Sequence, residues 1–133
     1  MKRTIPAVIV VIMLALITAS LIGCVRLTTD STKVILHFHY GENDIHEELT
    51  ENEAEEIRKM ISGKFYTLEL GTPSCGFTKD VSIEIGGKYY CPACDNCTTI
   101  YDPNVDRYFE ITEEQRSILE DIFSAHGGVF PCV

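Results

Sequence analysis

The sequence predicts an α+β fold, in which a small antiparallel sheet of about five or six strands packs against two amphipathic helices. Three observations predict it. Short runs alternate apolar and polar residues, a Gly86-Gly87 pair separates two of these runs, and two helical stripes each follow a capping box. An apolar N-terminal segment precedes this pattern and is expected to form a separate signal helix.

The first half of the pattern contains two strands and one helix. "KVILHFHY" (33–40) alternates apolar and polar residues, which predicts a strand. Thr50 and Glu53 form a capping box, which predicts a helix over residues 51–62. "FYTLEL" (65–70) is expected to be a second strand that ends at the turn residues of "GTPSCG".

The second half begins with a hairpin and ends with a helix. Both residues of Gly86-Gly87 tolerate positive φ, so the pair suits a two-residue hairpin turn. A second capping box, Thr112 with Gln115, precedes another apolar stripe. We therefore expect strands at 81–85, 88–91, 98–101 and 107–110, and a helix at 113–125.

The N-terminal segment has the features of an export signal. Lys2 and Arg3 form a short positive start, an apolar run extends from Ile5 to about Ile17, and small or weakly polar residues precede Cys24. The alternative is an uncleaved membrane anchor, since the apolar stretch approaches the length that spans a bilayer. Both alternatives place the residues after Cys24 outside the cytosol.

The end of this segment, "LIGC" (21–24), resembles the lipobox of bacterial lipoproteins. The resemblance implies cleavage between Gly23 and Cys24 and a diacylglycerol on the Cys24 sulfur. It also implies location at a bacterial cell membrane, lipid-anchored and facing outside the cytosol. The expected organisation is a signal peptide (1–23), a lipid-anchored polar tether (24–32) and a single acidic domain (33–133), the free tether reaching about 26 Å when extended.

The mature chain is strongly acidic. All 20 acidic residues follow Cys24, whereas two of the 11 basic residues, Lys2 and Arg3, precede it, which leaves a formal charge of −11. Such a charge repels phosphates, so nucleic-acid binding is excluded. The eight carboxylates from Glu42 to Glu56 are expected to form a solvated face.

If Cys24 is lipidated, five cysteines remain in the exported chain. Thiols outside the cytosol tend to pair, so we expect two disulfides and one odd cysteine. The pairing stays open, although a bridge from Cys75 to the loop at 91–97 is reasonable, and Cys132 could reach the same loop. The candidates are Cys75, Cys91, Cys94, Cys97 and Cys132.

The same cysteines permit a metal site. "YYCPACD" resembles the Cys-Pro-x-Cys knuckle of zinc ribbons, and this resemblance implies a four-sulfur zinc site at Cys75, Cys91, Cys94 and Cys97. Zinc ribbons normally use two such knuckles, whereas Cys75 stands alone. A thioredoxin-like redox pair is the third alternative, but that pair opens a helix, whereas Pro92 and Asp95 indicate a turn.

The sequence contains two further candidate metal sites, and each has a structural alternative. His37 and His39 share one strand face and could bind a metal with His46 or His126 as a third ligand; the alternative is two half-exposed histidines on an edge strand.

The second is a calcium loop at "DPNVDRYFEITE", but Arg107 stands where such a loop needs Gly, so a plain turn is the alternative. Its ligands would include Asp102, Asn104, Asp106 and Glu113.

The mature part looks like small cysteine-containing lipoproteins of unassigned function. The sequence contains no phosphate-binding glycine loop and no nucleophile elbow. It also shows no apolar pocket that would separate the pKa values of two carboxyl groups, so we do not expect an enzyme. The first hypothesis is a disulfide-supported binding module that needs no cofactor. Its partners would be the membrane, through the Cys24 lipid, and an envelope protein or small ligand. The alternatives are a zinc-binding protein and an envelope thiol-exchange protein.

Overall fold

The computed structural model describes residues 7–21, 23–27, 33–68 and 73–132. Its elements, in chain order, are α1 (Ala7–Leu21), β1 (Val34–Tyr40), β2 (Asn43–Glu48), α2 (Glu51–Ile61), β3 (Val81–Ile85), β4 (Lys88–Pro92), β5 (Thr99–Asp102), β6 (Arg107–Glu110) and α3 (Glu113–Ala125). The described strands form one six-stranded antiparallel sheet in the order β2-β1-β3-β4-β5-β6. The predicted α+β fold is confirmed.

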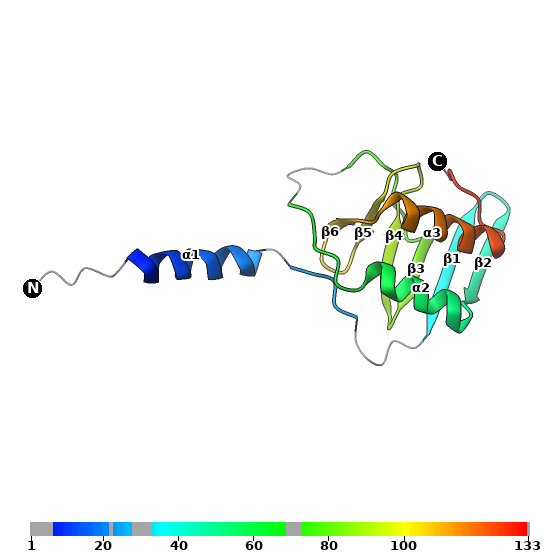
Figure 1. Ribbon diagram of the computed structural model, residues 1–133. Helices are drawn as coiled ribbons and strands as arrows, with labels where there is room; N and C mark the ends of the chain where they lie inside the picture. The colour runs from blue at the N-terminus through cyan, green and yellow to red at the C-terminus, as the bar shows by residue number, and fades with distance from the viewer. Residues whose placement is uncertain (1–6, 22, 28–32, 69–72, 133) are drawn as a thin grey trace, which may run out of the picture.

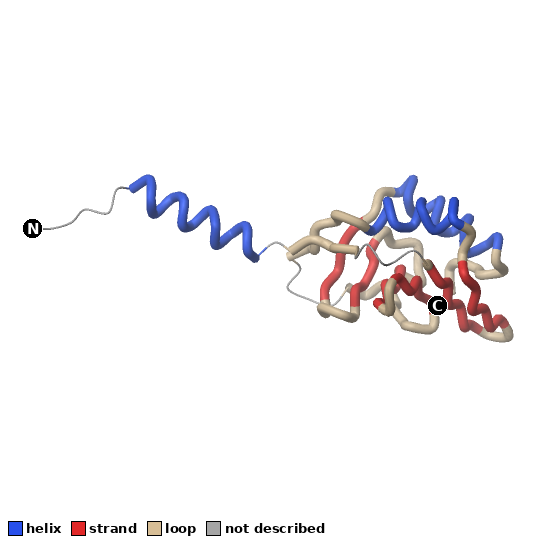
Figure 2. Tube along the Cα trace, turned by 90° about the horizontal axis from the view of Figure 1, so that it is seen from below, coloured by secondary structure: helices blue, strands red, loops and turns tan. Residues whose placement is uncertain are grey.

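The helices α2 and α3 lie on the same face of the sheet, as Figure 2 shows from the side. The core lies between these two layers, because alternate residues of each strand turn toward the helices. From the sheet it contains Val34, Leu36, Phe38, Val81, Ile83, Ile85, Tyr90, Ile100 and Phe109, and from the helices Ala54, Ile57, Met60, Ile61, Leu119, Ile122 and Phe123.

The local signals of the sequence correspond to local structure. Gly86 and Gly87 have φ values of 57° and 76°, so the β3–β4 turn uses the positive φ that favours glycine. Thr50 and Thr112 each accept a hydrogen bond from the backbone N–H three residues later, and both capping boxes are complete. Both predicted helices are therefore confirmed to within a residue or two.

The strand β2 was not predicted. It comes from the acidic run and pairs with β1, with His37 opposite His46 and Phe38 opposite Ile45. Five of its six residues are exposed, because β2 is the edge of the sheet. Charged side chains suit an edge strand, since they oppose pairing with another chain.

The segment just after Gly23 differs from the predicted tether. Val25 is only 2% exposed and belongs to the core, and Leu27 packs against that core. The Val25 N–H donates to the Lys64 carbonyl (2.8 Å), and the Gly63 N–H donates to the Val25 carbonyl (2.9 Å). Residues 23–27 therefore pack on the domain and are not a free tether; residues 28–32 lie outside the described residues.

The predicted strand at 65–70 does not form a regular strand; its described residues, 65–68, make two isolated β-bridges instead. Phe65 bridges Cys24 and Tyr66 bridges Phe109 of β6, so this segment joins the N-terminal residues to the β6 edge of the sheet. Residues 69 and 70 lie outside the described residues. In Figure 1, α1 extends away from the domain. No helix in the described part of the chain combines the length and the apolar character needed to span a membrane.

Candidate functional site

Three segments that carry cysteines meet at one corner of the domain. They are the connection before β3 (73–80), the loop after β4 (93–98) and the C-terminal segment. The Cys94 N–H donates to the Gly76 carbonyl (2.8 Å), and the Cys132 N–H donates to the Cys94 carbonyl (2.9 Å). Backbone hydrogen bonds thus join all three segments at Cys94.

The side chains at this corner form two cysteine pairs. Cys75 is hydrogen-bonded to Cys97, and Cys94 to Cys132. Cysteine pairs approach to 2.6–3.2 Å, longer than the bond of about 2.05 Å in a disulfide, and all six thiols are free. The structure therefore brings both Cys75 and Cys132 to the loop after β4, each to a different partner.

Cys91, the remaining cysteine of residues 25–133, is separate from these pairs. It is 1% exposed and lies at the end of β4, opposite Tyr101 of β5. Burial raises the pKa of the Cys91 thiol to about 12. Cys91 is therefore a buried neutral thiol at physiological pH, and a small apolar side chain in its effect on packing.

Two of the paired cysteines, Cys97 and Cys132, are also poor thiolates. The hydrogen bond with Cys75, and then that with Asp95, raises the pKa of Cys97 to about 12. Burial, and then the hydrogen bond with Cys94, raises the pKa of Cys132 to about 12. A catalytic thiol needs a lowered pKa, so these sulfurs do not have the electrostatics of an exchange nucleophile.

Asp95 lies beside the Cys75–Cys97 pair. Hydrogen bonds from the Cys97 side chain and backbone hold the pKa of its carboxyl below the usual range, and the Cys97 N–H contact is 2.9 Å. One ligand atom each from Cys75, Asp95 and Cys97 lie within 4.8 Å of one another. Among the described residues, this is the one group of three such side chains close enough for a metal ion.

The predicted four-sulfur zinc site is therefore divided in the structure. Cys75 and Cys97 come together with Asp95, whereas Cys94 pairs with Cys132, and Cys91 lies in the sheet. Two thiolates with a carboxylate would leave the fourth zinc position open.

A buried arginine, which the sequence did not single out, supports the loop after β4. Arg116 of α3 is 4% exposed, and its guanidinium donates to the carbonyls of Ala93 (2.9 Å) and Asp95 (2.8 Å). It also pairs with Glu120 (2.7 Å) and lies 4.6 Å from the ring centroid of Phe130. The sequence carries a signal for this burial, because Arg116 lies three residues before Leu119 and therefore on the buried side of α3.

A surface pocket of about 390 Å³ lies next to the Cys75–Cys97 pair. Phe77 packs against Tyr101 and Tyr108, with ring centroids 5.9 and 5.4 Å apart, on the sheet face opposite the helices. The Tyr101 hydroxyl donates to Asp106 (2.9 Å). The pocket is lined by Pro73, Ser74, Cys75, Gly76, Phe77, Tyr101, Asp106 and Tyr108, and we call it the aromatic pocket.

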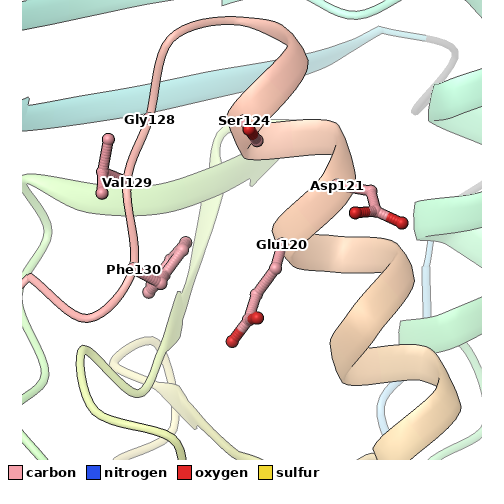
Figure 3. A pocket seen from close by; sticks show the side chains of 6 residues that line it. All are labelled: Glu120, Asp121, Ser124, Gly128, Val129 and Phe130. Carbon is pink, nitrogen blue, oxygen red and sulfur yellow. The ribbon is translucent and has the colours of Figure 1, made fainter.

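A second pocket, of about 250 Å³, lies between the end of α3 and the C-terminal segment (Figure 3). Glu120 points toward the gap between helix and tail, but its carboxylate already pairs with Arg116. Because the Glu120 carboxylate has a partner within the protein, this pocket is the weaker candidate.

The predicted histidine site is rearranged. His37 Nε2 lies 2.9 Å from a Glu84 carboxylate oxygen, and its Nδ1 lies 3.0 Å from His46 Nδ1. His39 contacts Asp44 (3.5 Å) instead. The two predicted ligands thus have different partners, and Glu84, from the neighbouring strand, is the carboxylate that linear spacing did not reveal.

The predicted calcium ligands do not converge on one point. Asp102 is 2% exposed and accepts hydrogen bonds from the Tyr66 hydroxyl (2.7 Å) and the Asn104 N–H (2.9 Å). Asp106 accepts from Tyr101, and Glu113 lies in the first turn of α3. The segment is a β5–β6 hairpin whose carboxylates have protein donors, so the turn interpretation fits this geometry.

Comparisons of the chain with models of protein families, with curated proteins and with solved structures found no match. Functional inference for this chain therefore depends on its own residues and their geometry.

Proposed function

We propose that the chain is a bacterial lipoprotein, and that its exported domain is a ligand-binding module supported by the disulfides Cys75–Cys97 and Cys94–Cys132. The observation that carries the proposal is the placement of four of the five cysteines in two pairs at one corner. Export by the N-terminal segment would put these pairs in a compartment where disulfides persist. Cys91 would remain the odd, buried thiol.

The paired segments are those that most need a covalent link. Residues 73–80 and 93–98 form no helix or strand, and the C-terminal segment follows the last helix. Disulfides stabilise such loop-rich regions by limiting the freedom of the unfolded chain. Their position here supports a structural role, and the raised thiol pKa values argue against thiol exchange.

The ligand site that we favour is the aromatic pocket. Its rings offer flat apolar faces and its rim offers the Asp106 carboxylate, a combination suited to a ligand with an apolar or cationic group. The Cys75–Cys97 disulfide would hold residues 73–77 against the rings. Reducing that disulfide would therefore weaken binding as well as stability.

Peptide mapping of the purified exported protein without reductant tests the two disulfides. We expect cross-linked peptides that contain Cys75 with Cys97 and Cys94 with Cys132, and an unlinked peptide that contains Cys91. Any other pairing, or five unlinked cysteines, would refute this part of the proposal.

Zinc binding at Cys75, Asp95 and Cys97 is the second candidate, because these three side chains lie close enough to hold one ion. Native mass spectrometry with and without a chelator distinguishes zinc binding from the two disulfides. The disulfide proposal expects no change with chelator and a gain of hydrogens with reductant. A loss of one zinc with chelator, together with unlinked Cys75 and Cys97, would favour the metal site. Asp95→Asn should abolish that zinc but leave a disulfide intact.

A further inference from the structure

The residues at the proposed cleavage site are fixed to the edge of the domain. Gly23 accepts a hydrogen bond from the Tyr66 N–H (3.0 Å), and two further hydrogen bonds join Val25 to Gly63 and Lys64. Cleavage after Gly23 would remove the first of these and leave the other two. Since Val25 is buried and successive side chains of an extended segment alternate in direction, the Cys24 side chain points away from the core.

Three large apolar side chains are exposed around this point. Phe65 is 67% exposed, Leu68 is 69% exposed and Val105 is 51% exposed. Phe65 bridges Cys24, Leu68 follows the segment that joins β6, and Val105 lines a pocket with Gly23. We call the surface formed by Phe65, Leu68 and Val105 around residues 23–25 the anchor surface.

The chain leaves the anchor surface directly into an apolar helix. The apolar residues of α1 from Val8 to Ile17 are 46–66% exposed, so the described domain does not cover them. From Leu21 to Cys24 the chain reaches at most about 10 Å. Buried Val25 directly follows Cys24 and comes four residues after the end of α1, so the domain begins close to the anchor whether this is a lipid on Cys24 or an uncleaved α1 (Figure 1).

Charge also distinguishes this end of the domain. Arg26 and Arg107 are exposed next to the anchor surface, although Asp106 is close by. Four of the eight carboxylates from Glu42 to Glu56 lie in the β1–β2 hairpin, and β2 is the edge of the sheet opposite β6. The other four lie in α2, whose C-terminal end approaches the anchor surface at Gly63. The acidic hairpin is therefore distant from the anchor, which lowers its repulsion by anionic lipids.

We infer that the anchor surface contacts the bilayer, with Phe65, Leu68 and Val105 at the boundary between headgroups and acyl chains. The inference rests on the proposed membrane anchor, and it adds a defined orientation: the β6 side of the domain faces the membrane, and β2 faces away. Exposed apolar groups held at a bilayer by an adjoining anchor lose contact with water when they enter this boundary.

The chain contains no tryptophan, so single tryptophans can report on each position. We would prepare Phe65→Trp, Leu68→Trp and Val105→Trp in the full-length protein, purify each from membranes and reconstitute it into phosphatidylcholine vesicles with and without brominated acyl chains. Val129→Trp is the matched control, because Val129 is 59% exposed and lies in the C-terminal segment, where the Asn43 side chain of β2 donates to the Gly127 carbonyl (3.5 Å). Co-flotation with vesicles is measured first on every sample.

The expected result is a blue-shifted emission and at least twofold quenching by brominated lipid at the three anchor-surface positions, with neither effect at Val129. If the proteins float with the vesicles but all four tryptophans have the emission of solvent-exposed indole, the orientation is refuted and the anchor survives. If the proteins do not float, the anchor itself fails and the inference fails with it. Quenching at Val129 equal to that at Phe65 would also refute a defined orientation.

Discussion

Replacing Cys132 by alanine removes one member of the Cys94–Cys132 pair, and with it the proposed covalent link between the C-terminal segment and the loop after β4. The disulfide would close a loop of 39 residues, counted from Cys94 to Cys132. In the chain-entropy account, a loop of this length contributes about 4 kcal/mol to the free energy of unfolding. The whole domain is expected to have only about 5–15 kcal/mol, so the effect is large.

A double-mutant cycle identifies the partners. If Cys94 and Cys132 are joined, then Cys94→Ala, Cys132→Ala and the double variant each lose about 4 kcal/mol, because the second change removes nothing more of the bond. Cys75→Ala breaks the other pair, whose loop of 23 residues contributes about 3 kcal/mol, and its loss should add to that of Cys132→Ala. Cys91→Ala serves as the control for removing a buried sulfur without a bond.

The assay is urea unfolding of the exported protein, followed by far-UV circular dichroism with and without reductant. With an m value of about 1.5 kcal/mol/M, a loss of 4 kcal/mol lowers the midpoint by roughly 2.5 M. In reductant, the wild type should fall to the level of a variant that combines Cys75→Ala with Cys132→Ala and so lacks both bonds. If the Cys94→Ala and Cys132→Ala losses are additive, or if reductant leaves the wild-type midpoint unchanged, the assigned pair is wrong.

Three further perturbations test other contacts. The hydrogen bond with Glu47 (2.7 Å) raises the pKa of His126, so this histidine stabilises the fold below its ordinary pKa of about 6.5 and loses that contribution as the pH rises through the raised value. The urea midpoints of wild type and His126→Gln should therefore differ more at pH 5.5 than at pH 8.5, and a constant difference would contradict the assignment. Arg116→Ala should lower the free energy of unfolding by about 3 kcal/mol, because two loop carbonyls and Glu120 lose a buried donor. Arg116→Lys should recover only part of this stability. A loss below about 1 kcal/mol for Arg116→Ala would contradict the supporting role of Arg116. Thr112→Ala removes the N-cap of α3 and should lower the free energy of unfolding by about 1 kcal/mol in the same assay, as should Thr50→Ala for α2. No change in either variant would show that water replaces the capping hydrogen bond without loss of stability.

Elements with strong local signals were predictable from the sequence. The capping boxes at Thr50 and Thr112 and the Gly86-Gly87 turn each depend on contacts within a few residues, so they can be recognised without knowing the fold. β2 was missed because its edge position allows Asp, His and Glu at nearly every place, and only Ile45 has an intermediate burial. The signal of a half-buried strand is weak in such a sequence.

The candidate site could be predicted only in part. The compartment argument led to two pairs and one odd cysteine, but the partners depend on long-range packing that brings Cys132 beside Cys94. The tether was misjudged because "VRLTTDST" has few apolar residues, although Val25 and Leu27 alternate with Arg26 in the manner of a short extended segment. Two apolar residues are too few to predict that this segment packs on the core, because the residues that it contacts lie far away in the sequence.

We propose that a membrane anchor at Cys24 and two disulfides act together in one domain. Intact-mass spectrometry of protein extracted from membranes, alkylated after denaturation without reductant, tests both parts in one measurement. The predicted mass is that of residues 24–133 with an acylated Cys24, two disulfides and one alkyl group, located at Cys91. A mass that retains residues 1–23, or alkylation of more than one of the cysteines, would contradict this proposal.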